Sequence, residues 1–431
     1  MLFNPEFSWE SLSEEQIVAK TLRALRNHIK HLFEISPYYR DFLKGVDPGD
    51  IQSLGDFSKL PFTCGTSMWE NLSCFSNVTQ EHVVESVMNT GFRGKPKLFT
   101  FTRNDLERLA YGNAISLHRC EVSKNDTVLI LSALESPSFS AMGCYRGVIS
   151  MGANAVRAGT GVSAEKLKMY LDHLKPTVVV GEPSLLRNLG KELNKGGYGT
   201  ENCSVTKLLC TKESVRTRNM ELDPVSVENE LIWGAQVFSM YGTTEVSAPY
   251  CDCSFRSGAH CIPVLVYTEI VDECGDAVKD GTPGELVATP FGVEGIPLVR
   301  FQTGDITFKI PGRCECGRNS DRIGPILGRK DQLIKKEKGV IFPLTLINAL
   351  DELEGINDYV IVIEDDSSRS DRVSIHVATP ASMVETISTK LREVTGEFFP
   401  VLISNVNTIR SLRGKMPVSE RILDWRFQSK S

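Results

Sequence analysis

Apolar residues near the start of the chain recur with the spacing of one helix face. They are four, three, four and three residues apart, at Val18, Leu22, Leu25, Ile29 and Leu32. This spacing is the period of an amphipathic α-helix. Ser13 and Gln16 precede the run with the residue types of a capping box, in which each side chain bonds the backbone amide of the other. The pattern therefore predicts a long opening helix.

Between about Asp105 and Ala235, helical stretches alternate with short apolar runs. Two clear runs are Thr-Val-Leu-Ile-Leu at 127–131 and Thr-Val-Val-Val at 177–180. Such alternation is typical of βαβ units, whose strands form a largely parallel sheet. The sequence therefore predicts a large domain with parallel or mixed sheets.

The pattern changes twice further along the chain. Segments 264–271, 285–289 and 306–310 read as strands separated by turns with glycine and proline, which predicts a β-rich subdomain. After Gly328 the pattern predicts a helix, a strand pair around a polar tip, a second helix and a last strand, at 344–353, 365–371, 382–394 and 402–406. We predict an α/β protein with a large N-terminal domain at 1–327 and a small α+β domain on a hinge at 328–431.

Composition adds bounds on function. A chain of 431 residues is longer than one core usually supports, which agrees with two domains. The net charge of -6 argues against a nucleic-acid binder. The first residues are acidic where a signal peptide is basic, and no apolar run has the roughly 18 residues of a membrane span. We therefore expect a cytoplasmic protein with no membrane or nucleic-acid partner.

Four short motifs follow one another in a meaningful order. They are Tyr-Gly-Thr-Thr-Glu at 241–245, Arg-Phe-Gln-Thr-Gly-Asp at 300–305, Gly-Arg-Lys-Asp at 328–331 and Gly-Lys at 414–415. The ordered set resembles the adenylate-forming (acyl-CoA synthetase) superfamily, in its phenylacetate-CoA ligase-like branch. Segments 36–40, 60–63, 102–106, 297–300 and 314–318 also resemble that branch, so the resemblance covers nearly the whole chain.

The resemblance implies roles for the first motif. Tyr241 would stack on the adenine of ATP, Thr244 would contact the α-phosphate and Glu245 would hold Mg²⁺, a hard ion that prefers oxygen ligands. Gly242 and Thr243 would complete this part of the nucleotide site. The alternative is an ordinary β-turn with a solvated glutamate.

The later motifs would complete the catalytic set. By resemblance Asp305 binds the ribose, Arg329 reaches the same sugar, and Asp331 is the hinge residue between the domains. Lys415, which we expect on a loop after a strand, corresponds to the catalytic lysine that bridges the carboxylate and the α-phosphate. The alternatives are a common Thr-Gly-Asp turn, a solvated linker and one surface lysine among many.

The phosphate loop departs from the family pattern. The family has a Ser/Thr-rich loop, but residues 89–96 here read Asn-Thr-Gly-Phe-Arg-Gly-Lys-Pro. Phe92 and Arg93 replace two hydroxyl residues, although an arginine can grip phosphate with two hydrogen bonds. The residues we expect at the phosphates are Thr90, Gly91, Arg93, Gly94 and Lys95. Glu213 is the one recognisable residue of the segment that usually lines the adenine.

The acyl pocket is expected after the strand at 128–131. Phe139, Ser140 and Met142 are candidate walls there, and Ala235 and Ser239 would lie opposite. Small residues opposite an aromatic ring would suit a flat aryl acid. Core packing is the alternative for each of these residues.

Twelve cysteines include a cluster with metal-ligand character. By resemblance Cys253, His260, Cys314 and Cys316 bind zinc, and Cys251 and Cys261 could substitute for them. Four such ligands make a closed tetrahedral site, so a structural role is expected. The alternative is buried free thiols and a histidine bonded to a backbone carbonyl.

These features predict an AMP-forming acid-thiol ligase. A carboxylic acid, aryl or arylacetic, would react with ATP to give an acyl-adenylate, and coenzyme A would then accept the acyl group. One alternative hands the acyl group to an acyl carrier protein or an amine. Another is a catalytically impaired nucleotide-binding relative. A homodimer is possible, although no sequence feature reveals an interface.

Overall fold

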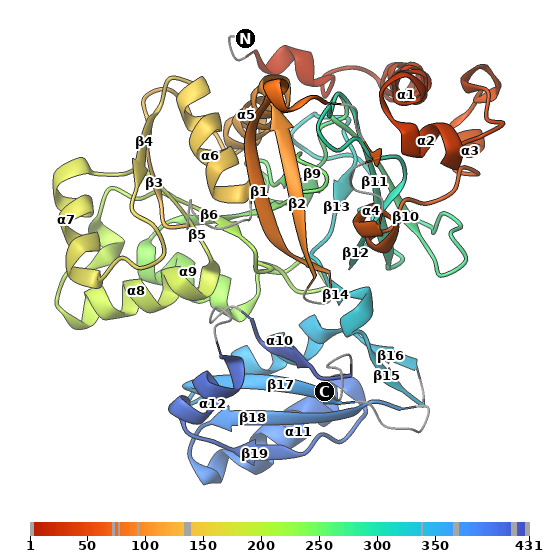
Figure 1. Cartoon of the computed structure of the whole chain (residues 1–431). Helices are drawn as coiled ribbons and strands as arrows, with labels where there is room; N and C mark the ends of the chain where they lie inside the picture. The colour runs from red at the N-terminus through yellow and green to blue at the C-terminus, as the bar shows by residue number, and fades with distance from the viewer. Residues whose placement is uncertain are drawn as a thin grey trace.

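The chain folds into two units that differ in size. The computed structural model describes residues 4–70, 74–75, 78–92, 95–132, 139–337, 339–364, 370–414 and 420–426. A large unit with several sheets lies above a small unit, which begins after residue 332 and has a sheet of its own (Figure 1). The start of the chain lies on the side of the large unit that is far from the small unit (Figure 1).

The predicted opening helix is present as α1 (Glu14–Ile35), and both hydrogen bonds of the predicted capping box are formed. The short helices α2 (Pro37–Phe42), α3 (Leu54–Phe57) and α4 (Gly65–Glu70) follow. Leu25, Ile29 and Leu32 of α1 are fully buried in one hydrophobic cluster with Leu298 and Val299. The start of the chain is thereby packed against a segment more than 250 residues later.

An eight-stranded sheet forms the centre of the large unit, in the order β13-β9-β8-β7-β6-β5-β3-β4. Its strands are β3 (Thr127–Ile130), β4 (Asn154–Arg157), β5 (Val178–Gly181), β6 (Lys207–Thr211), β7 (Gln236–Tyr241), β8 (Tyr250–Cys251), β9 (Ala259–His260) and β13 (Arg322–Ile323). The five neighbouring strands β4, β3, β5, β6 and β7 are parallel, as predicted. Strands β8, β9 and β13 extend the sheet with antiparallel pairing.

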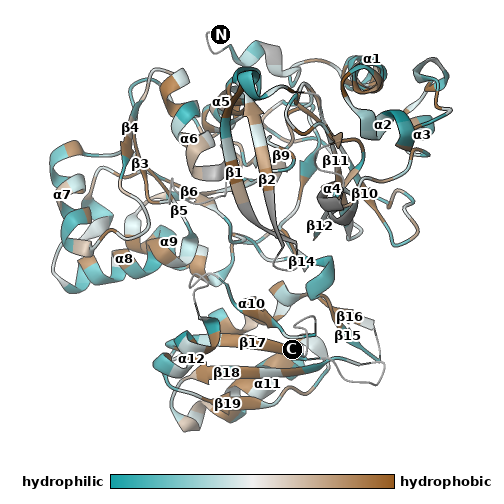
Figure 2. Ribbon diagram, in the orientation of Figure 1, coloured by the Kyte–Doolittle hydropathy of each residue, from teal (hydrophilic) through white to brown (hydrophobic). Residues whose placement is uncertain are grey.

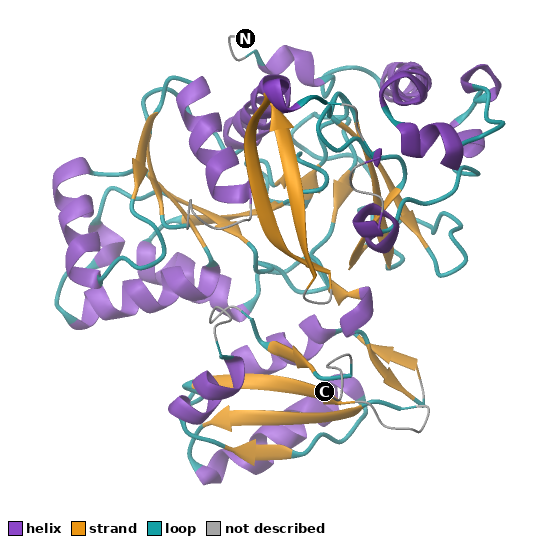
Figure 3. Cartoon of the chain, in the orientation of Figure 1, coloured by secondary structure: helices purple, strands orange, loops and turns teal. Residues whose placement is uncertain are grey.

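Helices cover both faces of this sheet (Figure 3). They are α5 (Arg103–Arg119), α6 (Phe139–Ser150), α7 (Ala164–Leu174), α8 (Pro183–Lys195) and α9 (Pro224–Trp233). Successive strand residues point to opposite faces. Thus Leu129 packs with the cluster of α7, α8 and α9, whereas Val128 and Ile130 pack with that of α5 and α6.

A second, antiparallel sheet is the predicted β-rich subdomain. It consists of β10 (Val266–Val271), β11 (Gly284–Pro290), β12 (Phe301–Thr307) and β14 (Gly328–Arg329). The prediction of a strand at 306–310 is wrong in its bounds, because β12 begins earlier and ends at Thr307. The segment Thr303-Gly304-Asp305 is also not a turn after a strand but lies inside β12.

A bulge explains this difference. Glu285 pairs with Ile306 while Val287 pairs with Gln302, so β12 carries more residues than β11 between the two pairs. Gly304 takes a positive φ of 79° there, a conformation that favours glycine. Bulges of this kind redirect a side chain next to a site, and here the residue that follows is Asp305.

The segment predicted as the phosphate loop lies in a two-stranded hairpin. β1 (Val83–Phe92) and β2 (Lys95–Thr102) pair antiparallel, with Phe92 opposite Lys95 at the tip. Thr90 and Gly91 are in β1, and Lys95 begins β2. Arg93, Gly94 and the side chains of residues 89–97 lie outside the described part of the chain.

The small unit has a four-stranded sheet in the order β19-β18-β17-β20. Its elements are the hairpin β15 (Ile334–Lys336) and β16 (Gly339–Ile341), helices α10 (Pro343–Asp351), α11 (Val384–Thr395) and α12 (Val406–Arg413), and strands β17 (Asp358–Glu364), β18 (Arg372–Ala378), β19 (Val401–Ile403) and β20 (Ile422–Asp424). α10 and α11 pack on one face of the sheet and α12 on the other. This arrangement explains the apolar colour of β17 and β18 (Figure 2).

Helix α12 corrects one expectation. Lys415 was expected after a strand, but the residues before it form α12, which ends at Arg413 with Gly414 as its cap.

β14 at Gly328 pairs with Ile306 of the large unit, and the short helical turn Lys330–Gln332 follows it. The small unit is therefore connected through residues 330–333, and rotation about Asp331 stays a prediction. Among the described helices, none is both long and apolar enough to cross a membrane.

Candidate functional site

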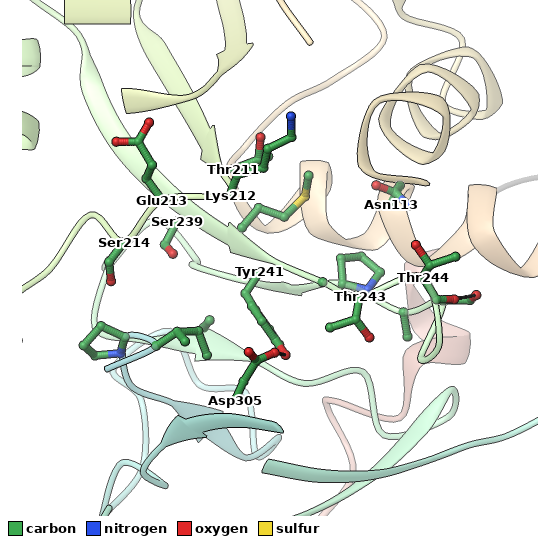
Figure 4. A pocket seen from close by; sticks show the side chains of 18 of the residues that line it. Asn113, Thr211, Lys212, Glu213, Ser214, Ser239, Tyr241, Thr243, Thr244 and Asp305 are labelled. Carbon is green, nitrogen blue, oxygen red and sulfur yellow. Dashed lines mark hydrogen bonds between the residues drawn. The ribbon is translucent and has the colours of Figure 1, made fainter. Parts of the chain in front are cut away.

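A cavity of about 290 Å³ opens where the parallel strands β6 and β7 end. Ligands of open α/β sheets bind in the crevice at the carboxyl ends of the strands. Residues 211–214 after β6 and 239–244 at the end of β7 line one part of the wall, and Asp305 and Arg329 of the second sheet line another. We call this space the central cavity (Figure 4).

Eight residues predicted from the sequence meet in this cavity. They are Glu213, Ser239, Tyr241, Gly242, Thr243, Thr244, Asp305 and Arg329. They lie in or directly after β6, β7, β12 and β14, so the fold collects motifs that are up to about 115 residues apart in the sequence. The chain's own side chains do not fill this space. A nucleotide site here requires that the space be open.

Asp305 is held firmly at the wall. Its Oδ2 accepts a hydrogen bond of 2.6 Å from the hydroxyl of Tyr241, and its Oδ1 lies 3.3 Å from Nη1 of Arg329. Burial raises the pKa of Asp305, and the charge of Arg329 opposes this shift. A carboxylate has about four acceptor positions, so Asp305 can still accept hydrogen bonds from a ligand.

Strand pairing explains why Arg329 is there. Asp305 of β12 and Arg329 of β14 are directly opposite in the antiparallel ladder. Asp331, two residues later, lies 3.4 Å from Nε of the same arginine, and it is not among the described residues that line the cavity. Arg329 thus carries its charge between two carboxylates.

The first motif leads into a turn that begins at Thr243. The amide of Ser247 donates to the carbonyl of Thr243 at 3.1 Å, and the hydroxyl of Ser247 donates to the carbonyl of Thr244 at 2.7 Å. Glu245 in this turn is half-buried and does not line the cavity, but its charge raises the pKa of both Asp305 and Arg329. It therefore lies close enough to act on the site electrostatically.

Glu213 connects the cavity to the small unit. The hydroxyl of Ser184, at the start of α8, donates to Oε2 of Glu213 at 2.6 Å. Nη2 of Arg421, from the small unit, donates to the same hydroxyl at 3.1 Å. Burial raises the pKa of Glu213 to about 7, while the Ser184 hydrogen bond and Arg421 lower it.

Two predicted walls of the acyl pocket lie elsewhere. Ala235 packs in the core cluster with Trp233 and Val237, beneath the helices α8 and α9. Met142 is half-buried on α6 and does not line the described cavity. Ala235 precedes β7, whereas the cavity opens at the other end of that strand, where Ser239 lies.

Several predicted residues fall outside the described part of the structure. Lys415, the predicted catalytic lysine, lies in the undescribed segment 415–419. Phe139 and Ser140 begin α6, but their side chains are outside the described set, as are those of Thr90, Gly91 and Lys95. Their roles stay predictions.

The predicted metal ligands converge into one group. The ligand atoms of Cys253, His260, Cys314 and Cys316 all lie within 4.8 Å of one another. Sγ of Cys253 is 3.6 Å from Sγ of Cys314, and Sγ of Cys316 is 3.5 Å from Nε2 of His260. Ligand atoms around tetrahedral zinc are about 3.5–3.8 Å apart for bonds of about 2.3 Å to sulfur and 2.0 Å to nitrogen. We call this group the Cys/His cluster.

Its surroundings favour a structural site. Nδ1 of His260 is 2.8 Å from the hydroxyl of Ser320, a contact that directs Nε2 toward the cysteines. Burial lowers the pKa of His260 to about 2, so the ring is neutral and free to ligate. The two possible substitutes are not in the group, since Cys251 instead lies 3.5 Å from Cys120 in the core. Three of the four ligands are buried.

Part of the cavity wall consists of residues that were not predicted from the sequence. Leu109 and Asn113 of α5, the loop residues 247–249, Ala259 and residues 324–326 all line it. One signal was available for α5, because Asn113 follows Leu106 and Leu109 at helical spacing and is a polar residue on an otherwise apolar face.

Comparison with known proteins places this geometry in context. No family model matches the chain. The phenylacetate-coenzyme A ligase of Thermus thermophilus is 29% identical over 343 residues, which cover 78% of this chain and 74% of that protein. That of Escherichia coli is 26% identical over 427 residues, which cover 94% and 95%. The chain is similar to phenylacetate-coenzyme A ligases. The predicted resemblance is thus confirmed over nearly the full length.

Solved structures confirm the fold. A 2-hydroxyisobutyryl-CoA ligase in its postadenylation state matches with a TM-score of 0.85 at 21% identity, covering 96% of this chain and 91% of that one. The same ligase in its thioesterification state gives 0.70 at 23% identity, covering 97% and 91%. The arrangement of the chain is therefore closer to the postadenylation form. The relatives named here are coenzyme A ligases, as the predicted enzyme class requires.

Proposed function

We propose that this protein is an AMP-forming ligase that joins an aryl or arylacetic acid to coenzyme A. A carboxylate oxygen attacks the α-phosphorus of ATP, and the bond to the leaving pyrophosphate breaks. The thiolate of coenzyme A then attacks the acyl carbon, and AMP leaves with the electron pair of the broken carbon–oxygen bond. The observation that carries the proposal is the central cavity, in which Tyr241, Thr244, Asp305 and Arg329 meet in a chain similar to acid-CoA ligases.

Asp305 is the proposed anchor of the ribose. Tyr241 and Arg329 hold its two oxygens in place, so its orientation is fixed before the nucleotide arrives. A preorganised acceptor avoids the cost of ordering on binding. Arg329 also supplies a positive charge to a site that must hold a triphosphate.

The repulsion between the carboxylate and the phosphate requires further cations. Lys415 is the proposed bridge between them, because a lysine ammonium is a compact point charge. Glu245 is an oxygen ligand within electrostatic range of Asp305 and Arg329, so it can hold Mg²⁺. Such an ion neutralises the developing charge of the phosphates when bound.

The Cys/His cluster is proposed to bind one structural zinc ion. The ligand spacing and the contact that orients His260 support zinc, and four protein ligands leave no coordination position for a substrate. The ion would join the loop after β8 to the loop after β12, because Cys253 lies in the first and Cys314 and Cys316 lie in the second.

Product analysis tests the proposed reaction. The full chain is incubated with ATP, Mg²⁺ and a panel of aryl, arylacetic and short aliphatic acids, with and without coenzyme A. We expect AMP and the acyl thioester to accumulate together only when coenzyme A is present. ATP consumption that no acid stimulates would overturn the proposal, and acyl transfer to an amine without coenzyme A would favour the alternative acceptor.

Replacement of the proposed catalytic lysine gives a second test. Lys415→Ala is expected to slow adenylate formation by about 10²- to 10³-fold, while ATP binding, measured by calorimetry, stays unchanged. Lys195→Ala, at an exposed position of α8, is the matched control. Full activity of Lys415→Ala would mean that another group stabilises the transition state.

A further inference from the structure

The proposed nucleotide contacts do not include Asn113, a polar residue that lines the central cavity. Asn113 of α5 lines the cavity, although only 3% of the residue is exposed. Figure 4 draws Asp305, Glu213 and Ser214 on one side of the pocket and Asn113, Thr243 and Thr244 on the other. In that view Asn113 lies on the side of Thr244 and away from Asp305, the proposed ribose contact.

A hydrogen bond fixes the orientation of the Asn113 side-chain amide. Nδ2 of Asn113 donates to the carbonyl of Leu109 at 2.9 Å. Because a carbonyl can only accept, the NH₂ group must face Leu109, and Oδ1 must point the other way. The described structure gives Oδ1 no hydrogen-bond partner, and this oxygen is not among the fully enclosed unpaired atoms. A ligand in the cavity that Asn113 lines can therefore reach this oxygen.

Close packing prevents the side chain from turning away. A Cβ atom at Gly143 of α6 would lie 2.5 Å from Nδ2 of Asn113, and one at Gly147 would lie 2.7 Å from its Cβ. Helix α6 can approach α5 this closely only because both positions are glycines. The amide is held between the two helices, so its oxygen is a preorganised acceptor.

The surroundings of Asn113 suit the acyl group of a substrate. A Cβ at Gly112 would be 3.1 Å from Pro249, and a Cβ at Gly242 would be 3.6 Å from the same proline. The part of α5 that carries Asn113 is thus adjacent to the turn that carries Thr244, the proposed α-phosphate contact. Leu109, Ala248 and Pro249 give this end of the cavity an apolar wall, which suits the carbon skeleton of an acid.

We propose that the acid this enzyme activates carries a hydroxyl or amino group that donates a hydrogen bond to Oδ1 of Asn113. The inference rests on the proposed ligase function and narrows its substrate to hydroxy- or amino-substituted aryl acids. An acid without the donor leaves a buried acceptor unpaired, which lowers the rate of adenylation by about 10- to 100-fold.

Matched pairs of acids test the inference. Acid-dependent exchange of labelled pyrophosphate into ATP is measured for phenylacetate against its 3- and 4-hydroxy derivatives, and for benzoate against its hydroxy and amino derivatives. We expect kcat/KM to favour a substituted acid by at least about tenfold in one pair. The pair with the largest preference, which we call the winning pair, shows where the hydroxyl or amino group lies on the acid. Equal or better rates for the unsubstituted acid in every pair would overturn the inference.

Variants show whether Asn113 causes the preference. Asn113→Leu keeps a similar volume without an acceptor, and we expect the ratio within the winning pair to fall to about one, with exchange on the unsubstituted acid retained. Asn113→Ala also removes the acceptor but is smaller, so it controls for steric effects of the leucine side chain. Ser116→Ala is the control, because Ser116 is a fully buried polar residue of the same helix that does not line the cavity. An undiminished preference in both Asn113 variants would overturn the inference.

The same experiment separates the inference from the function it rests on. Exchange by the wild-type chain with unsubstituted acids alone would uphold the ligase and reject the role of Asn113. Absence of exchange with every acid would reject the adenylation chemistry, and the inference with it.

Discussion

Two neighbouring residues of β9 belong to two different kinds of site. Ala259 lines the central cavity, and His260 belongs to the Cys/His cluster. Successive strand residues face opposite sides of a sheet, so this strand separates the two sites. The cluster closes on itself, with all four ligand atoms within 4.8 Å. The cavity keeps about 290 Å³ open between its polar groups.

The difference shows how polar residues for stability and for function can be told apart. In the Cys/His cluster the ligand atoms contact one another and the hydroxyls of Ser320 and Ser257. In the cavity Asp305 is oriented by Tyr241 and Arg329, but space remains beside it. Changes in the cluster should therefore reduce stability, and changes in the cavity should reduce activity in a chain that stays folded.

Loss of the cluster is expected to have the largest effect. Cys316→Ser removes one ligand, so metal content measured by elemental analysis should fall from about one zinc per chain to near zero. The unfolding free energy should fall by about 4 kcal/mol, since loss of a structural metal is among the most destabilising changes. Cys274→Ser, at an exposed cysteine outside the cluster, is the control. Unchanged stability would show that the cluster is a group of free thiols.

Removing the charge of Asp305 should reduce activity and leave stability unchanged. Asp305→Asn keeps the size of the side chain but should weaken its proposed hold on the ribose and its contact with Arg329, and we expect about a 100-fold loss in kcat/KM for pyrophosphate exchange. Metal content and melting temperature should stay at wild-type values. Asp280→Asn, at an exposed aspartate, is the control. An equal loss of zinc or of stability would break the distinction between the two regions.

Arg421 tests the boundary between the units. It bonds Ser184 of the large unit, lies 3.2 Å from Asp351 of its own unit, and its guanidinium is 4.4 Å from the ring centre of Tyr359. We expect this contact to stabilise the present arrangement of the two units, so Arg421→Ala should slow pyrophosphate exchange about tenfold, or about 1.4 kcal/mol in activation free energy. Thioester formation from a synthetic acyl-adenylate should be unchanged.

The control for Arg421 is Arg410→Ala, at an exposed arginine of α12. An equal decrease in both half-reactions would mean that Arg421 only stabilises the small unit.

The smallest expected effect is a dependence of stability on pH. Burial raises the pKa of Glu213 from 4.5 to about 7 in the folded chain. The folded state thus binds a proton that the unfolded state has lost, so the unfolding free energy falls as pH rises from about 4.5 to about 7. Glu213 is half-buried, which limits the effect to about 1 kcal/mol. Glu213→Gln should flatten this slope in urea unfolding measured at pH 5 and pH 7.5, and parallel wild-type and variant curves would contradict the assignment.

The sequence predicted those features whose pattern is local. The capping box at Ser13, the apolar runs of β3 and β5, and the motifs with Tyr241 and Asp305 each depend on a few neighbouring residues. The metal ligands were assigned by resemblance, because Cys253 and Cys314 are about sixty residues apart in the sequence.

Features that depend on tertiary contacts were missed or misplaced. The bulge at Gly304 exists only because β12 pairs with β11, and it turned a predicted strand end into the middle of a strand. Asn113 became a cavity residue only when α6 packed against it and Pro249 lay beside its helix. Ala235 was expected in the pocket because it is close in sequence to Tyr241, but the strand carries it to the opposite end.

A single exchange assay shows whether the central cavity activates a carboxylic acid with ATP. Labelled pyrophosphate is exchanged into ATP by the wild-type chain and by Asp305→Asn, with hydroxy- and amino-substituted aryl acids and without coenzyme A. If the cavity has this role, exchange depends on the acid and falls about 100-fold in the variant. Exchange of the same rate in both proteins, or none with any acid, would contradict it.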